Sequence, residues 1–206
     1  KKLNIKYSQK EYVKLNHRTM WDIIKHFSKV KSNAKIRQMW QFAKQFEYPH
    51  KYVKIPTDGV KTVAALSKKY KLAIVTARVK IGVDKVLKRY GYSKYIKTRV
   101  SFEDYKNPKP HPEPLLVALR KLRIKPNEAV YVGDMEADVF CARSAGVISI
   151  LYKNSYSKLR RSKPDYMVTS FKKLLKLFTY FVNLRDSKIP SVKWFVNLFG
   201  IRLSKN

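Results

Sequence analysis

Apolar residues recur at spacings of three and four positions along the first fifty residues of the chain. One run extends from Val13 to Phe27 and a second from Ile36 to Phe46, a spacing typical of helices that bury one face. The polar stretch from Ser28 to Asn33 separates the two runs, and no glycine occurs before Gly59. The pattern therefore predicts helices over residues 8–48.

From residue 60 onward, helical runs alternate with short, continuous apolar segments typical of buried strands. Helices are predicted at residues 60–70, 81–90, 113–122, 137–145 and 171–182, and strands at residues 72–75, 99–102, 129–132, 147–151 and 165–168. Strands separated by helices form right-handed βαβ units and a parallel sheet. We therefore expect an α/β fold whose ligand site lies at the carboxyl ends of the strands.

Charge and composition narrow the class of protein. The chain of 206 residues has 46 Lys and Arg against 14 Asp and Glu, a net charge of +32. Such a surface attracts nucleic acid or acidic lipid without specifying either, and no nucleic-acid-binding motif is present. A single cysteine, Cys141, excludes a disulfide framework and a cysteine-rich zinc site. No apolar run approaches the ~18 residues of a membrane span, so we expect a cytoplasmic protein.

Three predicted strand ends carry polar residues that suit one chemistry. Thr76 follows the strand 72–75, Lys109 lies in the proline-rich segment 107–112, and acidic residues follow the strand 129–132. With 14 acidic residues in 206 positions, a five-residue window holds about 0.3 on average, and positions 134–138 hold three. These side chains could hold a phosphoryl oxygen, offset its charge and bind Mg²⁺, respectively. Alone, each also fits an ordinary strand-terminal threonine, a surface lysine or helix N-terminal acids.

The order of these residues resembles the haloacid dehalogenase-like hydrolase superfamily, in its phosphoglycolate phosphatase-like branch. The motifs that carry the resemblance are Leu72-Ala73-Ile74-Val75-Thr76, Lys109-Pro110-His111-Pro112 and Val132-Gly133-Asp134-Met135-Glu136-Ala137-Asp138. The resemblance covers residues 60–182. It implies a three-layer Rossmann-like core over residues 56–182 with an N-terminal helical cap over residues 1–55.

The resemblance also implies site residues and a reaction. Thr76 and Lys109 would bind the phosphoryl group, and Asp134 with Asp138 would hold Mg²⁺ as the cofactor. The expected activity is a Mg²⁺-dependent phosphatase that hydrolyses a small phosphate monoester through a phospho-aspartyl intermediate. Dehalogenase chemistry is the close alternative within the fold, but it needs no Mg²⁺ and leaves the paired acids unexplained.

One motif of the family is missing. Its first motif, D-x-D-x-[TV] at the end of an opening hydrophobic strand, supplies the nucleophile. The only near match, Pro56-Thr57-Asp58-Gly59-Val60, has proline at the nucleophile position and lies too close to Thr76 to accommodate a cap. Because the chain begins with Lys1, we expect the opening strand to lie upstream and this chain alone to be inactive. The other possibility is a chain that never had this strand.

A second class of function stays open. A non-catalytic member of the superfamily could use the fold as a scaffold on RNA or on a large anionic assembly. Residues 183–206 form a basic, amphipathic C-terminal extension whose apolar residues are Trp194, Phe195, Val196, Leu198, Phe199, Ile201 and Leu203. The extension fits a terminal helix packed on the core or on another subunit, and alternatively a contact with an anionic surface.

Overall fold

The computed structural model describes residues 11, 20–45, 58–155, 157–183 and 194–196. The chain divides into two compact units, Lys1–Pro49 and His50–Asn206. Much of the sequence predicted to be a helical cap lies outside the described residues, as does most of the predicted C-terminal extension.

Two helices form the described part of the first unit. Helix α2 spans Met20–Ser28 and helix α3 spans Asn33–Lys44, so the predicted polar break between two helices is confirmed. The side chain of Ser32 accepts a hydrogen bond from the backbone of Lys35 and caps α3. Ile24 and Ile36 are buried, as expected for the apolar faces of a helix pair.

The second unit alternates helices and strands along the chain. Its elements are α4 (Gly59–Ser67), β1 (Lys71–Val75), α5 (Lys80–Arg89), β2 (Thr98–Val100), α6 (Glu113–Leu122), β3 (Ala129–Gly133), α7 (Glu136–Ser144), β4 (Ile148–Tyr152), β5 (Tyr166–Val168), α8 (Phe171–Asn183) and β6 (Trp194–Val196), with short 3₁₀ helices η2 (Phe102–Asp104) and η3 (Pro126–Glu128). The ten helices and strands predicted between residues 60 and 182 are all present. Across the described ranges, every helix is too short or too polar to cross a membrane.

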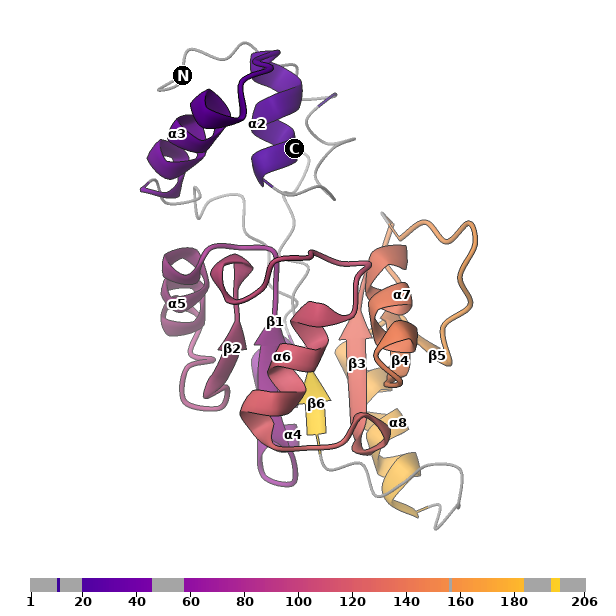
Figure 1. Ribbon diagram of the computed structural model, residues 1–206. Coiled ribbons are helices and arrows are strands. Elements are labelled where there is room, and N and C mark those ends of the chain that lie inside the picture. The colour runs from indigo at the N-terminus through magenta and orange to yellow at the C-terminus, as the bar shows by residue number, and fades with distance from the viewer. Residues whose placement is uncertain (1–10, 12–19, 46–57, 156, 184–193, 197–206) are drawn as a thin grey trace. The chain divides into compact units, whose positions relative to one another are not determined.

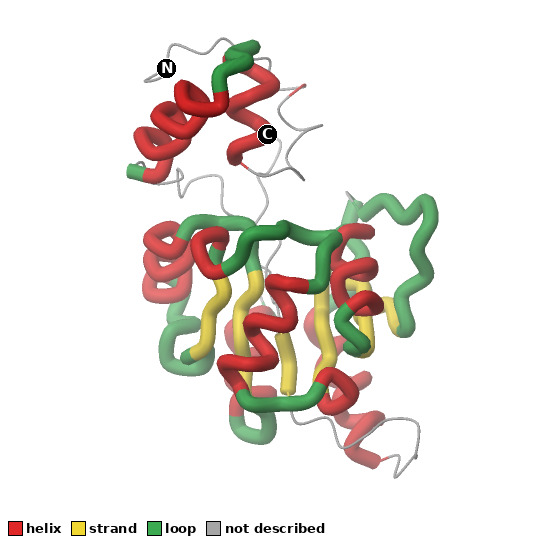
Figure 2. The backbone as a smooth tube through the Cα atoms, viewed as in Figure 1, coloured by secondary structure: helices red, strands yellow, loops and turns green. Residues whose placement is uncertain are grey.

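The strands form one parallel sheet in the order β2-β1-β6-β3-β4-β5. Helices cover both faces of the sheet, with α6 and α7 on the near face in Figures 1 and 2. The arrangement is the three-layer α/β architecture that the sequence predicts. All strands point the same way, so the loops that follow β1, β2, β3 and β4 lie along one edge (Figure 1).

Neighbouring residues of each central strand serve opposite faces of the sheet. In β1, Leu72 and Ile74 pack into one hydrophobic cluster with α4, α5 and α8. Ala73 and Val75 pack into the other cluster with α6 and α7. Side chains alternate along a strand, so a strand covered on both sides must be apolar throughout. That requirement explains the unbroken apolar runs in the sequence.

The centre of the sheet holds a strand that the sequence analysis did not predict. Strand β6 pairs in parallel with β1 on one side, where Phe195 lies opposite Leu72, and with β3 on the other, where Phe195 lies opposite Val130. The prediction of a terminal helix was therefore wrong for Trp194–Val196. The other residues of the C-terminal extension after Asn183 lie outside the described residues. A segment from the last part of the sequence thus occupies the middle of the sheet.

Candidate functional site

The predicted site residues follow three elements at the carboxyl edge of the sheet. Thr76 comes directly after β1, Asp134 comes directly after β3, and Lys109 lies in the loop between η2 and α6. The hydroxyl of Tyr105, in that loop, donates a hydrogen bond of 3.1 Å to the carbonyl of Thr76. The loop that carries Lys109 is thereby tied to the end of β1.

Lys109 and Asp138 form the polar centre of the site. Lys109 Nζ lies 2.6 Å from Asp138 Oδ1 and donates a second hydrogen bond of 3.2 Å to the hydroxyl of Tyr131. The Tyr131 hydroxyl in turn donates to the same Asp138 oxygen over 3.0 Å. These three side chains come from a loop, a helix and a strand. The sequence predicts a shared site for Lys109 and Asp138, whereas the role of Tyr131 was not predicted.

The second oxygen of Asp138 holds the turn that follows β3. Oδ2 accepts hydrogen bonds from the backbone amides of Asp134, at 3.1 Å, and Met135, at 3.0 Å. Asp138 approaches Gly133 so closely that a β-carbon at position 133 would overlap its side chain. Gly133 is therefore required by this contact, and Asp138 fixes the conformation that presents Asp134.

Lys109 and Asp138 are both largely buried, so each charge strongly affects the pKa of the other group. Only 4% of the Asp138 side chain and 17% of the Lys109 side chain are exposed. Burial alone would raise the pKa of Asp138, but attraction to Lys109 and the surrounding hydrogen bonds lower it below its usual value. Burial would likewise lower the pKa of Lys109, and the charge of Asp138 raises it instead. Both groups are charged at neutral pH, so a fixed cation lies beside Asp134.

Asp134 is buried and contacts the loop between β4 and β5. Its Oδ2 accepts a hydrogen bond of 3.2 Å from the side-chain amide of Asn154, and its backbone carbonyl accepts one of 2.8 Å from the hydroxyl of Ser157. Glu136 holds the same loop further along, through three backbone amides. Asn154 and Ser157 were not singled out in the sequence, and Glu136 was counted in the acidic cluster of positions 134–138 without this role.

Thr76 lies on the same edge but apart from the other site residues. Its hydroxyl accepts a hydrogen bond of 3.2 Å from the backbone of Arg78. Within the described residues no hydrogen bond joins Thr76 to Lys109, Asp134 or Asp138, because β6 separates β1 from β3. The structure thus joins Lys109 to Asp138, ties Asp134 to them through the backbone, and places Thr76 across the central strand.

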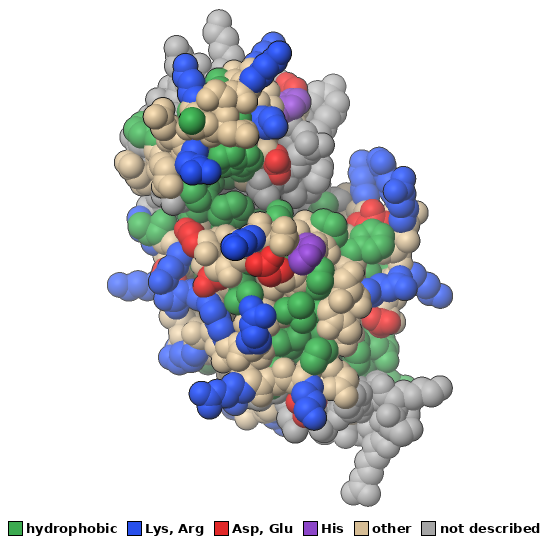
Figure 3. Space-filling view, in the orientation of Figure 1, with side chains coloured by type: hydrophobic (Ala, Val, Ile, Leu, Met, Phe, Trp, Pro, Cys, Tyr) green, Lys and Arg blue, Asp and Glu red, His purple; other side chains and the backbone are tan. Residues whose placement is uncertain are grey.

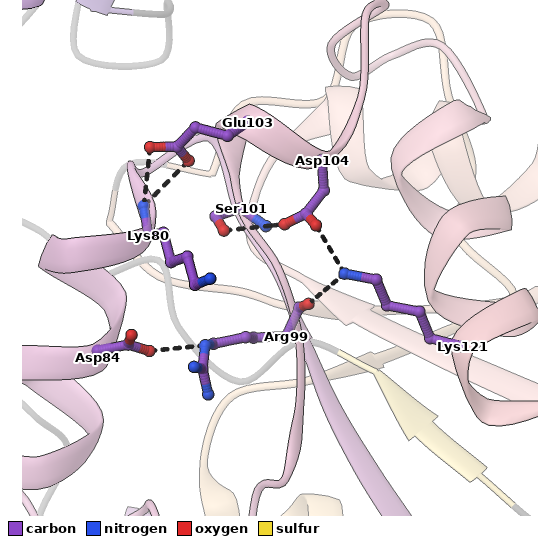
Figure 4. Close-up of polar contacts among 7 residues, drawn as sticks. All are labelled: Lys80, Asp84, Arg99, Ser101, Glu103, Asp104 and Lys121. Carbon is purple, nitrogen blue, oxygen red and sulfur yellow. Dashed lines mark hydrogen bonds and ion pairs between the residues drawn. The ribbon is translucent and has the colours of Figure 1, made fainter.

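Other acids near this edge have structural roles. Figure 4 shows Glu103 accepting hydrogen bonds from the backbone of Lys80 at the start of α5. In the same view Asp104 accepts from the backbone and hydroxyl of Ser101 and pairs with Lys121 at 2.6 Å. These contacts hold the loop after β2 in place. The acids of this loop are therefore engaged in shaping it.

Two further features bear on the chemistry. Among the described residues no group of three His, Cys, Asp or Glu side chains is arranged to hold a metal ion. Cys141 is fully buried, and burial raises the pKa of its thiol to about 12. A buried thiol that stays protonated is a poor nucleophile. Cys141 therefore belongs to the core beneath the site.

Comparison with known proteins identifies the family. The model of the haloacid dehalogenase-like hydrolase family matches residues 1–152. Pyrophosphatase PpaX of Bacillus mycoides is 31% identical over 159 residues, covering 74% of each chain. A protein of Caldanaerobacter subterraneus named as a candidate pyrophosphatase PpaX is 36% identical over 135 residues, covering 64% of this chain and 61% of its own.

A solved structure agrees with this comparison. The crystal structure of a predicted phosphoglycolate phosphatase from Haemophilus somnus is 27% identical, with a TM-score of 0.56 over 61% of this chain and 57% of that chain. A parallel sheet covered by helices on both faces defines a Rossmann-like α/β protein. The chain belongs to the haloacid dehalogenase-like hydrolase family, and to its phosphoglycolate phosphatase-like branch. It spans about three fifths of the length of the Caldanaerobacter relative.

Proposed function

We propose that this chain forms the phosphoryl-binding site of a Mg²⁺-dependent phosphatase that acts on a small phosphate monoester or on pyrophosphate. The observation that carries the proposal is the buried network of Lys109, Asp138 and Tyr131 beside Asp134. Phosphoryl transfer depends on positioning and on neutralising the charge of the phosphoryl oxygens. A buried, permanently charged lysine at the strand ends supplies part of that neutralisation. The relatives named as pyrophosphatases support the choice of substrate class.

The residues take distinct roles in this proposal. Lys109 binds a phosphoryl oxygen, and the hydroxyl or backbone of Thr76 binds another from the opposite side of the central strand. Asp138 keeps Lys109 charged and holds the turn of Asp134 and Met135. Each role uses a contact or a position that the side chain already has, so the site is preorganised for an anion.

The donors present suit Mg²⁺, a cation that prefers carboxylate and other oxygen ligands. We assign Asp134 as the residue that holds the metal, because it is buried at the strand end. Both oxygens of Asp138 already accept hydrogen bonds, so Asp138 acts mainly by supporting Asp134. Direct contact between Asp138 and the metal stays a prediction. When bound, the metal would offset charge on the phosphoryl group.

The phospho-aspartyl reaction also needs a carboxylate nucleophile. An aspartate oxygen displaces the leaving group from phosphorus, and water then releases phosphate and restores the aspartate. The resemblance implies that this aspartate belongs to the family's first motif, D-x-D-x-[TV], at the end of an opening hydrophobic strand. The sequence of residues 1–206 contains no match to that motif. We therefore expect the chain, as its sequence stands, to turn over slowly.

The test is release of phosphate from an aryl phosphate and from pyrophosphate, with Mg²⁺ and with chelator. We expect weak turnover by the chain itself and a Mg²⁺-dependent increase of at least about tenfold when a strand that carries the family's first motif is fused ahead of Lys1. The same fusion with asparagine in place of the first aspartate of that motif serves as the matched control. Rapid turnover by the unaltered chain would contradict the proposal, because a different nucleophile would then be at work.

The excess of basic residues favours a second candidate, a scaffold that binds RNA or another polyanion without catalysis. A chain with a net charge of +32 binds nucleic acid to some degree whatever its function, so binding alone does not discriminate. If the charge is only a solvated surface, RNA binding at ~0.15 M salt is weak and indifferent to sequence, and this is the result we expect. Sequence-preferring RNA binding at that salt would favour the scaffold.

A further inference from the structure

The loop between β4 and β5 combines a fixed backbone with exposed cationic side chains. Residues 153–165 include five basic side chains, which are Lys153, Lys158, Arg160, Arg161 and Lys163, and one acid, Asp165. All five basic side chains are exposed. In the part of the chain that the structure describes, none of them forms an ion pair. Asp165 is engaged by the backbone and hydroxyl of Ser149.

The backbone of this loop is held against the candidate site. Glu136 Oε1 accepts hydrogen bonds from the amides of Arg160 at 2.7 Å, Arg161 at 2.6 Å and Ser162 at 3.0 Å. Near the other end of the loop, Asn154 and Ser157 bind Asp134. Of the two anchoring acids, Asp134 lies in the turn that follows β3 and Glu136 is the first residue of α7.

This construction has an electrostatic cost that an anion would relieve. Like charges held close together repel one another, and a flexible loop would let them separate. Here Glu136 binds the backbone of Arg160 and Arg161 and leaves their side chains exposed, and no carboxylate of the described residues forms an ion pair with either guanidinium group. Figure 3 shows Lys and Arg side chains projecting where Figure 1 places this loop. The loop therefore presents an unneutralised cationic surface at the rim of the phosphoryl site.

We infer that the β4–β5 loop is an anion-binding subsite that recognises a second negatively charged group of the substrate, remote from the phosphoryl group that reacts. The inference rests on the proposed function, because its location beside Asp134 favours a small polyanion bound at the same site. Arginine suits the role, since its planar guanidinium forms paired hydrogen bonds with phosphate oxygens. The subsite thus selects diphosphates and other polyanionic phosphates over simple monophosphates.

Calorimetric titration with Mg²⁺ at ~0.15 M salt tests this inference. The probes are inorganic phosphate, pyrophosphate and tripolyphosphate. The unaltered chain should bind the two larger anions at least about tenfold more tightly than phosphate, as one additional charge-assisted hydrogen bond would give. In Arg160→Gln/Arg161→Gln this preference should fall to within about threefold, with phosphate affinity unchanged. Lys172→Gln/Lys173→Gln, two exposed positions on α8, removes the same charge elsewhere and should keep the preference.

The outcomes separate the two proposals. No binding of any of the three anions would overturn the proposed function itself. Binding of phosphate with an equal preference in both double variants would overturn the subsite and leave the proposed function standing. Loss of binding to a short RNA in the loop variant, with tripolyphosphate binding unchanged, would also overturn it and make the loop a nucleic-acid surface.

Discussion

At the residue scale, the site depends on one close approach and one buried ion pair. Gly133 allows the side chain of Asp138 to pack against the end of β3, and Asp138 then reaches Lys109, Tyr131 and the following turn. Asp138 therefore does more than its place in a metal-binding motif indicates, because it also binds a lysine, a tyrosine and two backbone amides. Two substitutions separate the packing contribution from the electrostatic one.

The packing contribution is tested by Gly133→Ala. The added methyl group would overlap Asp138, and overpacking of this kind costs about 1–3 kcal/mol of unfolding free energy. Gly82→Ala is the matched control, because a β-carbon there meets only Val79 at an ordinary contact distance. Glycine inside a helix is destabilising by roughly 0.5–1 kcal/mol relative to alanine, so the control should gain stability. Equal denaturation midpoints for the two variants would contradict this account.

The electrostatic contribution is tested by Asp138→Asn. Removing one partner leaves Lys109 buried and unpaired, which should cost about 3–5 kcal/mol at neutral pH. Asp84→Asn breaks the half-exposed pair with Arg99 and should cost about 0–1 kcal/mol. Urea denaturation of both variants measures the difference. Similar losses of unfolding free energy in both variants would mean that burial does not increase the contribution of the Lys109–Asp138 pair to stability.

The same pair sets the acid limb of stability. The folded-state pKa of Asp138 lies below its ordinary value, so the stabilisation is fully present above about pH 4 and is lost as the pH falls through the folded-state pKa. Asp138→Asn should therefore flatten the decline in stability below pH 4. An acid limb unchanged in this variant would assign the decline to other carboxylates.

At the scale of elements, most of the sheet could be predicted from local patterns. Each predicted strand is bounded by a turn, and each helix has its own apolar face. Gly91 and Gly146, which lie just past the ends of α5 and α7, both adopt the left-handed conformation typical of glycine at a helix C-terminus. Strand β6 was missed because a three-residue apolar segment fits a helix or a strand equally well. Its pairing with β1 and β3 joins residues more than sixty positions apart.

The site could be predicted only in part, for a related reason. Lys109, Asp134 and Asp138 were found because their type and order carry information. Tyr131 was hidden in an apolar strand, although a buried tyrosine hydroxyl generally needs a polar partner. Contacts of Asn154, Ser157 and Glu136 depend on how a loop folds back, which local spacing does not encode.

The central place of β6 leads to a prediction about proline. Phe195→Pro removes a backbone donor and inserts a ring in a strand with a neighbour on each side, which natural sheets avoid. Thr98→Pro alters the first residue of β2, an edge strand, where proline is tolerated. We expect Phe195→Pro to cost about 1–3 kcal/mol more than Thr98→Pro in thermal or urea unfolding. Equal costs would mean that β6 contributes little to the core.

At the scale of the whole molecule, a small number of acidic side chains holds the loops of a very basic chain in place. Several of the acids accept backbone hydrogen bonds in loops at the carboxyl edge of the sheet, among them Glu103, Asp104, Glu113, Glu136 and Asp138. They shape the loops that surround the site, and most of the basic side chains are left to face solvent. A surface of this charge attracts anions, and the proposed site would fix one of them at the strand ends.

The most direct test of this account is calorimetric titration of inorganic phosphate in the presence and absence of Mg²⁺, on the unaltered chain and on Asp134→Asn. The account predicts that Mg²⁺ raises phosphate affinity at least about tenfold in the unaltered chain, because the metal offsets charge on the bound anion. It predicts that Asp134→Asn loses this effect, while Asp84→Asn, which lies away from the site, retains it. Phosphate binding that is indifferent to Mg²⁺, or a Mg²⁺ effect that survives in Asp134→Asn, would contradict the account.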